Sequence, residues 1–499
     1  MNMLLALQEA ASKPNEALIK QIDSLGQSIE QLGHEQEKLA QVAGIDTATH
    51  ATKLEIFHGY IGIFVVAFLI TLLVTPIMRR LAVRYGIIDQ PNQARKIHRM
   101  PIAYLGGVAV FLGLIAGIFF SYIGMLYPNS GLVTWHTTSH LIGDDPSAMV
   151  PFPVPPSIIF GMTIIMLVGL IDDVIGIEPR LKIGGQLVAA AVLAFDNVGV
   201  QVAKGVLSPT LGKWIGNHDL IFNIPTGIDI PGITHMLTTG SPGMSFDLIY
   251  WTGTAIIAIF VLGACNASNL LDGLDGLLTG TTAICATALL IIALTLAVLD
   301  DGPRDAQRVV LSMALLGACL GFLPYNFNPA VIFLGDSGSL LMGFTTIVIV
   351  LSLGDTGKTH LVMAGLVIYA IPIIDTCLAI VRRRLARKSM SEPDSDHLHH
   401  MLKRALGVKG AVFTLYALGM GFGALGVAMS LWRARVAYAL AGIFIAYIGV
   451  ISIKIARRQQ IEAEAAGIKP PPPSTRPGHA KPKSAKSQPR APRQASKTG

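Results

Sequence analysis

Long apolar runs recur along most of this chain, and no other feature constrains its fold as strongly. A run of about 20 uncharged residues can cross the hydrocarbon core of a bilayer as a helix, which pairs its own backbone groups where water is absent. The sequence therefore predicts an all-α polytopic membrane protein with about 10–11 transmembrane helices. The predicted helices lie at 54–78, 103–124, 157–172, 181–196, 248–265, 276–299, 307–325, 337–354, 360–381, 410–430 and 434–454.

Basic residues concentrate in a few of the loops between these helices. The loop 79–102 contains six Lys and Arg residues and the loop 382–409 contains eight, whereas the loop 125–156 contains none. Because cytoplasmic loops of membrane proteins carry the excess of Lys and Arg, we place the two basic loops in the cytoplasm and the N-terminus outside. Counting the helices in order brings three further loops to the cytoplasmic face, at 172–180, 266–275 and 325–336.

The two ends of the chain differ from the transmembrane domain, which we place at 54–456. In residues 1–53, Leu and Ile recur at spacings of three and four. That pattern predicts an extracytoplasmic amphipathic helix on the membrane or, alternatively, a short coiled coil that joins two chains into a homodimer. Residues 457–499 are rich in Pro, Lys and Ala, which predicts a disordered basic cytoplasmic tail. The net charge of +7 thus indicates cytoplasmic loops and anionic lipid rather than nucleic acid.

The segment 266–280 is polar and glycine-rich, although it joins two apolar runs. Its backbone groups would be unpaired in lipid, so it must face water or line a protein cavity. It contains Asn266, Asn269, Asp272 and Asp275, and amides and carboxylates on a tight turn suit a metal ion and a phosphate group. Alternatively, the two Asp residues are only N-caps of the following helix, a position that favours Asp.

Three further acids lie at predicted cytoplasmic helix ends. Asp172 and Asp173 fall at the C-terminal end of a helix, where the dipole disfavours negative charge and adjacent carboxylates need a shared cation or proton. Asp336 stands between Gly335 and Gly338 on the same face, which favours a metal ligand. The alternatives are a solvated helix end for the first two acids and an N-cap for the third.

Three histidines occur in the more basic of the two cytoplasmic loops, where residues 394–400 read Asp-Ser-Asp-His-Leu-His-His. His397, His399 and His400 are a candidate transition-metal site, but no Cys accompanies them, and the surrounding Arg and Lys favour an anion. We therefore interpret them as phosphate ligands. Together, the acids, amides, histidines and cations at one membrane boundary predict a site that brings two anions together around a hard cation, Mg²⁺ or Mn²⁺.

A transporter and a membrane scaffold are the two other classes of protein that fit a chain with this many apolar runs. Transporters usually place ionisable groups near the middle of the membrane. Here the acids cluster at helix ends, and Asp375 is the only carboxylate clearly inside a predicted helix. The intact set of acids argues against a scaffold.

Five short motifs follow one another along the chain. They are Asp89-Gln90-Pro91-Asn92 with Arg95-Lys96-Ile97-His98 and Gly106-Gly107, then Asp172 through Gln186, Asn266 through Gly280, Asn326 through Ser339, and His397 through His400. In this order they resemble the polyprenyl-phosphate N-acetylhexosamine-1-phosphate transferase family, of glycosyltransferase 4 type, over residues 55–430.

Two details refine this resemblance. The second and fifth motifs are more similar to the undecaprenyl-phosphate GlcNAc-1-phosphate transferases than to the phospho-MurNAc-pentapeptide translocases, where three consecutive His would be expected. At Ala103-Tyr104 the chain departs from the Pro-Arg pair that is usual in the family. Any substrate contact made from that turn in other members is therefore not carried over to this chain.

The resemblance implies a reaction. A polyprenyl phosphate would attack the β-phosphorus of a UDP-N-acetylhexosamine, above all UDP-GlcNAc, to give a polyprenyl-diphospho-sugar and UMP. This would be the first membrane step of cell-envelope polysaccharide synthesis, in a multi-pass protein of the plasma (inner) membrane whose active site faces the cytoplasm. The alternative within the family is phospho-MurNAc-pentapeptide transfer in peptidoglycan synthesis.

The same resemblance implies roles for individual residues. Asp336 and Asn269 would hold Mg²⁺ or Mn²⁺ on the diphosphate. The catalytic candidates are Asp172 and Asp173, against the attacking lipid phosphate, and Asp275, whose role is left open. The predicted substrate-binding residues are Asp272, Asn326 and Phe333 for the nucleotide, His397, His399 and His400 for the diphosphate or sugar, and Lys96.

Overall fold

The computed structural model describes residues 52–89, 101–127, 152–224, 244–299, 302, 304–385 and 397–465. The chain divides into two units, Met1–Glu55 and Ile56–Gly499, and nearly all of the described residues belong to the second. The predicted N-terminal amphipathic or coiled-coil segment before residue 52, the basic tail beyond residue 465 and the predicted substrate ligand Lys96 lie outside the described residues.

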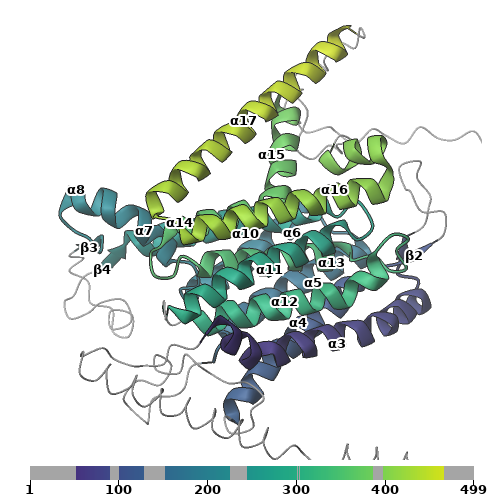
Figure 1. Cartoon of the computed structure of the whole chain (residues 1–499), viewed down its shortest axis with the longest axis horizontal. Coiled ribbons are helices and arrows are strands. Elements are labelled where there is room, and N and C mark those ends of the chain that lie inside the picture. Colours follow the sequence, from purple (N-terminus) through teal and green to yellow (C-terminus); the bar gives the residue numbers. More distant parts are fainter. Residues whose placement is uncertain are drawn as a thin grey trace, which may run out of the picture. The chain divides into compact units, whose positions relative to one another are not determined.

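Helices make up nearly all of the described chain (Figure 1). Eight of the described helices are long and apolar enough to cross a membrane. They are α3 (Lys53–Tyr85), α4 (Gly106–Leu126), α5 (Pro156–Ile175), α10 (Leu248–Leu271), α11 (Leu277–Val298), α12 (Asp305–Asn326), α13 (Gly335–Ser352) and α16 (Leu398–Leu431). The expectation of an all-α polytopic membrane protein is confirmed.

Three of the predicted transmembrane helices take other forms. α6 (Pro179–Phe195) has 17 residues, which at about 1.5 Å per residue is slightly less than the ~30 Å hydrocarbon core. The predicted helix 360–381 is two helices, α14 (Thr359–Ile368) and α15 (Ala370–Leu385), bent by 78° where they meet. α17 (Ala434–Ala465) continues past residue 457, where we expect the tail to begin, although its apolar part is Ala434–Tyr447.

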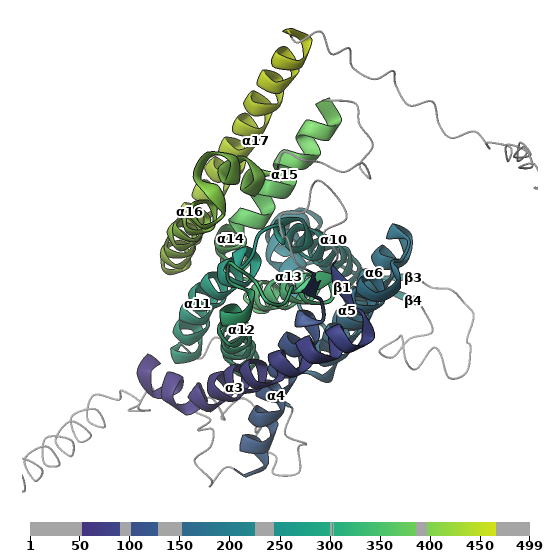
Figure 2. The same cartoon turned by 90° about the vertical axis from the view of Figure 1, so that its right-hand side faces the viewer.

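α13 lies at the centre of these helices because it is apolar on all sides. Every residue from Ser337 to Ser352 is buried, and α13 contacts α4, α5, α10, α11 and α12 (Figure 2). By contrast, α3 buries a residue only at every third or fourth position, such as Ile56, Tyr60 and Ile63, which leaves its other face to lipid. The central position of α13 brings its first residues into contact with the ends of its neighbours.

Glycine allows the start of α4 to approach the start of α13 closely. The backbone N–H of Gly106 donates to Phe333 O at 3.1 Å, and that of Gly107 donates to Leu334 O at 2.8 Å. A Cβ atom on Gly107 would overlap the backbone of Gly338. The turn that precedes α13 is therefore held against the turn that precedes α4.

Short elements cover the ends of the long helices. β1 (Ile88–Asp89) pairs with β2 (Ile102–Ala103) in an antiparallel sheet at the end that carries the acids. After α6, α7 (Gln201–Leu207), a π-helical turn (Ser208–Gly212) and α8 (Lys213–Ile215) lead to β3 (Ile221–Ile224), which pairs with β4 (Met244–Asp247) directly before α10.

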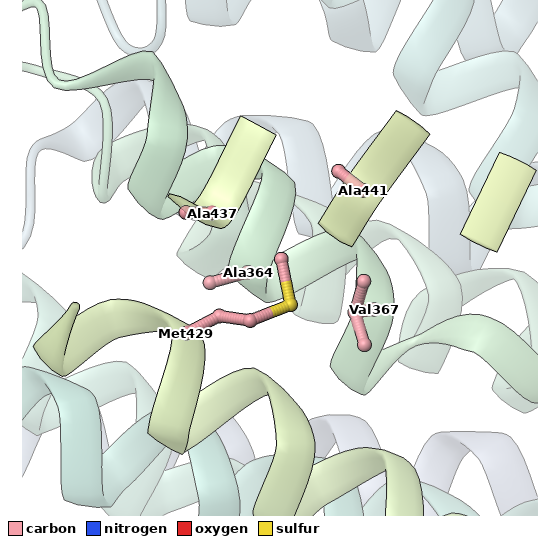
Figure 3. Close-up of a cluster of buried hydrophobic side chains, with 5 residues drawn as sticks. All are labelled: Ala364, Val367, Met429, Ala437 and Ala441. Carbon is pink, nitrogen blue, oxygen red and sulfur yellow. The ribbon is translucent and has the colours of Figure 1, made fainter. Parts of the chain in front are cut away.

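Small residues hold α17 against α14 and α16. Ala437 and Ala441 of α17 are buried with Ala364 and Val367 of α14 and Met429 of α16, and Figure 3 shows the five side chains facing one another. Alanine lets the helix backbones come close, which favours helix association where no hydrophobic effect operates between helices.

Candidate functional site

Three helix ends bring most of the predicted site residues together. Asp172 and Asp173 lie in the last turn of α5, Asn269 in the last turn of α10, and Asp336 in the first turn of α13. Since α5 and α10 both pack on α13, their C-terminal ends meet its N-terminal end. The structure thus places side by side four side chains from three segments that are more than 60 residues apart along the chain.

Asp173 caps α13 from a different helix. Its Oδ1 accepts a hydrogen bond from the backbone N–H of Asp336 at 2.7 Å, and its Oδ2 accepts one from Ser337 at 3.0 Å. These N–H groups have no partner within α13, and the positive end of the helix dipole favours a carboxylate there. Gly335 adopts a φ of 73°, and a Cβ on it would overlap the Asp173 carboxylate. Both oxygens of Asp173 therefore bind backbone.

Lys182, in the first turn of α6, is a site residue that sequence analysis missed. Its Nζ lies 2.7 Å from Asp172 Oδ2 and also forms an ion pair with Asp336 Oδ2. Asp172 Oδ1 accepts a further hydrogen bond from Ile177 N at 2.8 Å. The one signal in the sequence was a Lys that follows two unneutralised acids within the second motif. It supplies the cation that adjacent acids at a helix C-terminus require.

Asn269 connects α10 to the same carboxylate. Its Nδ2 donates to Asp336 Oδ1 at 2.7 Å and to Ser339 Oγ at 3.0 Å. One turn earlier, Asn266 Nδ2 donates to Gln186 Oε1 of α6 at 2.9 Å. The two amides thus fix the end of α10 against α13 and α6.

The site carries more acidic than basic groups. The carboxylate of Asp272, just after α10, forms no hydrogen bond or ion pair with the described residues, and its burial, together with Asp336, Asp173 and Asp275, raises its pKa to about 8. Within the part of the chain that the structure describes, no three His, Cys, Asp or Glu side chains are grouped closely enough to hold a metal ion. The chemistry of the side chains nevertheless fits a hard divalent cation, because half-buried carboxylate and amide groups outnumber the one Lys among them.

Asp275 braces the turn between α12 and α13. Its Oδ2 accepts hydrogen bonds from Asn328 Nδ2 at 2.9 Å and from Ala330 N at 3.0 Å. Through these contacts the carboxylate stabilises the turn. Neither contact bears on the catalytic role that we predict for Asp275.

Asn326 and Phe333, the predicted nucleotide ligands, lie at the two ends of the same turn. Asn326 is buried, accepts a hydrogen bond from Thr279 Oγ1 at 2.9 Å and donates to Ile332 O at 3.2 Å. The ring of Phe333 lies 6.1 Å from that of Tyr104, centroid to centroid. Asn326 thus shapes the turn that presents Phe333 beside the acids.

The three histidines pack against the segment 266–280 at the start of α16. His399 is 1% exposed, and its imidazole occupies the space that a side chain at Gly273 would need. The ring centroid of His399 lies 5.5 Å from that of His397, with an interplanar angle of 11°, and 4.2 Å from that of His400. The histidines and the acid-bearing turn after α10 therefore form one continuous site.

Comparison with known proteins agrees with this architecture. Residues 155–354 match the family described as glycosyl transferase family 4. The chain is 32% identical over 381 residues to the decaprenyl-phosphate N-acetylglucosaminephosphotransferase of Mycobacterium tuberculosis, covering 73% of this chain and 81% of the relative. It is 28% identical over 363 residues to a probable undecaprenyl-phosphate N-acetylglucosaminyl 1-phosphate transferase of Bacillus subtilis, covering 72% and 82%.

A more distant similarity links the chain to a second branch. It is 31% identical over 280 residues to the phospho-N-acetylmuramoyl-pentapeptide-transferase of Moorella thermoacetica, covering 55% of this chain and 76% of the relative. Together these similarities show that the protein is a multi-pass membrane transferase. It belongs to the polyprenyl-phosphate N-acetylhexosamine-1-phosphate transferase family, as the five motifs indicate.

Proposed function

We propose that this protein transfers GlcNAc-1-phosphate from UDP-GlcNAc to undecaprenyl phosphate and releases UMP. The observation that carries the proposal is that Asp172 and Asp336 share Lys182, and Asn269 binds Asp336, at one end of three membrane helices. The two relatives named for N-acetylglucosamine phosphate transfer align with 73% and 72% of the chain, against 55% for the pentapeptide transferase. That difference favours GlcNAc over the alternative substrate.

In the proposed reaction an oxygen of the lipid phosphate bonds to the β-phosphorus of UDP-GlcNAc. The bond from that phosphorus to the bridging oxygen breaks, and UMP leaves with the electron pair. A phosphate monoester has a second pKa of about 6, so the lipid phosphate is mostly dianionic at neutral pH. The main barrier is therefore the repulsion between two anions, and removal of a proton matters less.

The residues of the site suit that task. Asp336 and Asn269 would hold Mg²⁺ or Mn²⁺, which when bound neutralises charge on the diphosphate. Asp173 fixes the first turn of α13, so that Asp336 keeps its place. Lys182 joins α6 to the ends of α5 and α13 and adds a positive charge beside the reacting groups. The histidines would contact the diphosphate.

The proposal places the site at the cytoplasmic face of the plasma (inner) membrane, in cell-envelope polysaccharide synthesis. Support comes from the basic loops 79–102 and 382–409, because cytoplasmic loops of membrane proteins carry the excess of Lys and Arg.

The test is UMP release by purified protein in detergent with undecaprenyl phosphate, UDP-GlcNAc and Mg²⁺. We expect release that depends on lipid and stops on chelation or in Asp336→Asn. Asp219→Asn is the control, because this exposed carboxylate lies far from the site in sequence and only approaches Lys204 at 3.9 Å. Release of UMP with UDP-MurNAc-pentapeptide but not with UDP-GlcNAc would instead assign the protein to the phospho-MurNAc-pentapeptide transferases. No release with any UDP-N-acetylhexosamine would refute the proposal.

A further inference from the structure

Asp375 is a buried acid that the proposed reaction does not use. It lies in the second turn of α15, shortly after the bend from α14, and its side chain is fully buried. An isolated carboxylate there would be costly unless hydrogen bonds or a cation compensate for the lost hydration. Its partners therefore indicate why the chain keeps an acid at this position.

Those partners belong to the histidine motif at the start of α16. Asp375 Oδ1 accepts a hydrogen bond from the backbone N–H of Leu398 at 2.7 Å. Asp375 Oδ2 lies 3.1 Å from His397 Nδ1 and 3.7 Å from His399 Nδ1. One carboxylate thus holds both the backbone of the motif and the ring of its first histidine.

This contact determines which nitrogen of His397 can meet a ligand. An ionised carboxylate accepts hydrogen bonds, so the Nδ1 of His397 carries the proton that faces Asp375. Nε2 has no partner among the described residues, and it is the nitrogen left for substrate. Among the described residues, His400 and Lys403 on α16 are further titratable groups close to the motif, and no hydrogen bond or ion pair joins either of them to the Asp375 carboxylate.

We propose that Asp375 is a positioning residue for the diphosphate of the nucleotide sugar. It orients His397 so that Nε2 faces a phosphate oxygen, and it caps the first turn of α16 so that the three histidine rings stay packed together. This inference rests on the proposed function, because the diphosphate is that of the UDP-sugar. It also explains why Asp375 lies inside a predicted transmembrane helix, a position for an acid that is otherwise typical of transporters.

A double-mutant cycle between Asp375→Asn and His397→Gln tests the proposal. We expect Asp375→Asn to raise the KM for UDP-GlcNAc by about tenfold with little change in kcat, as loss of an orienting partner does. In the His397→Gln background the same change should alter KM by less than about twofold, because its effect passes through that ring. Asp375→Glu, which keeps the carboxylate, should recover most of the affinity. Thr376→Val is the control, since this neighbouring hydroxyl has no hydrogen-bond partner within the described part of the chain.

Binding of inorganic diphosphate to the purified protein supplies a readout that does not need turnover. Its Kd should rise with Asp375→Asn and follow the same non-additive cycle. Independent, additive losses in the two variants would overturn the proposal, as would an unchanged KM and Kd in Asp375→Asn. If Asp375→Asn does not yield folded protein, the cycle is run with Asp375→Ser, which keeps an oxygen acceptor but removes the carboxylate. A wild-type protein that binds diphosphate through this pair but releases no UMP would refute the proposed reaction and leave the positioning role standing.

Discussion

Asp336 and Asp172 share the cation Lys182, yet we expect them to contribute unequally to catalysis. Asp336 also accepts a hydrogen bond from Asn269 and is the predicted metal ligand. Because the lipid phosphate is already ionised at neutral pH, losing charge neutralisation should cost more than losing a base. We expect Asp336→Asn to lower kcat/KM by about 10²–10³-fold and Asp172→Asn by about tenfold, measured as UMP release at saturating Mg²⁺. Equal losses, with the Asp172→Asn defect restored at higher pH, would instead indicate a true general base.

Asp272 should make the stability of the metal-free protein depend on pH. Burial and the neighbouring acids raise its pKa to about 8, so the folded protein keeps a proton that the unfolded chain releases near pH 4. The folded state then binds more protons across this interval, and its stability falls as pH rises toward 8. We expect the unfolding midpoint in EDTA to decrease between about pH 5 and 8, and less steeply in Asp272→Asn. Parallel curves for the two proteins would contradict this assignment.

At the same scale, sequence reasoning found the acids but not all of their partners. The position of Asp172, Asp173 and Asp336 at one membrane boundary follows from run lengths and basic loops, which are local features. Lys182 was missed because its role depends on α6 packing back against α5, which places Nζ between two carboxylates. A single Lys at the start of a predicted helix gives no sign of that contact.

At the scale of elements, the crossing of α4 and α13 depends on glycine. We expect Gly107→Ala to destabilise the protein by about 1–3 kcal/mol, because the new methyl group overlaps the backbone of Gly338. Activity should fall as well, since this contact holds the turn before Asp336. Gly263→Ala is the matched control, because open space surrounds that helical glycine. Unfolding midpoints in detergent and UMP release check the pair, and equal effects of the two variants would refute the argument.

The sequence predicts that the region 360–381 is helical, but it does not predict the bend that divides this region into α14 and α15. The run 360–381 reads as one apolar helix, with Pro372 as the only local sign of a break. The structure bends at Tyr369, whose hydroxyl donates to Ala264 O at 3.0 Å and lies 2.5 Å from Ser268 Oγ, both on α10. In Figure 1 α15 accordingly runs across the direction of α10, which brings Asp375 to the histidines.

At the scale of the whole molecule, the end opposite the site is held by buried ion pairs. Arg308 of α12 is fully buried, forms an ion pair with Asp305 at 2.5 Å and donates to Ser352 O of α13 at 2.9 Å. Arg304 forms an ion pair with Asp355 at 2.8 Å and donates to Asp196 O after α6 at 3.0 Å. These contacts tie the far ends of α6, α12 and α13 together.

Removing one member of this network should destabilise the protein without altering its chemistry. We expect Arg308→Met to cost about 3–5 kcal/mol, because it leaves the Asp305 carboxylate buried and unneutralised. The double variant Arg308→Met with Asp305→Leu should be more stable than the single variant. Unfolding midpoints measure both, while kcat/KM of folded protein should stay within about twofold, since the site lies at the other end of α13. A large loss of kcat/KM at full folding would show that the two ends are coupled.

By itself the sequence determined that this protein is a multi-pass helical membrane enzyme with its acids at one boundary. Run length, charge placement and short motifs settle those points, because each depends on residues close together in the chain. The tertiary structure alone decided what the acids do. Asp173 caps the N-terminus of α13 from α5, Asp275 stabilises the turn before α13, and Asp375 orients His397. Such contacts join segments far apart in sequence, and they follow from helix packing that no local pattern encodes.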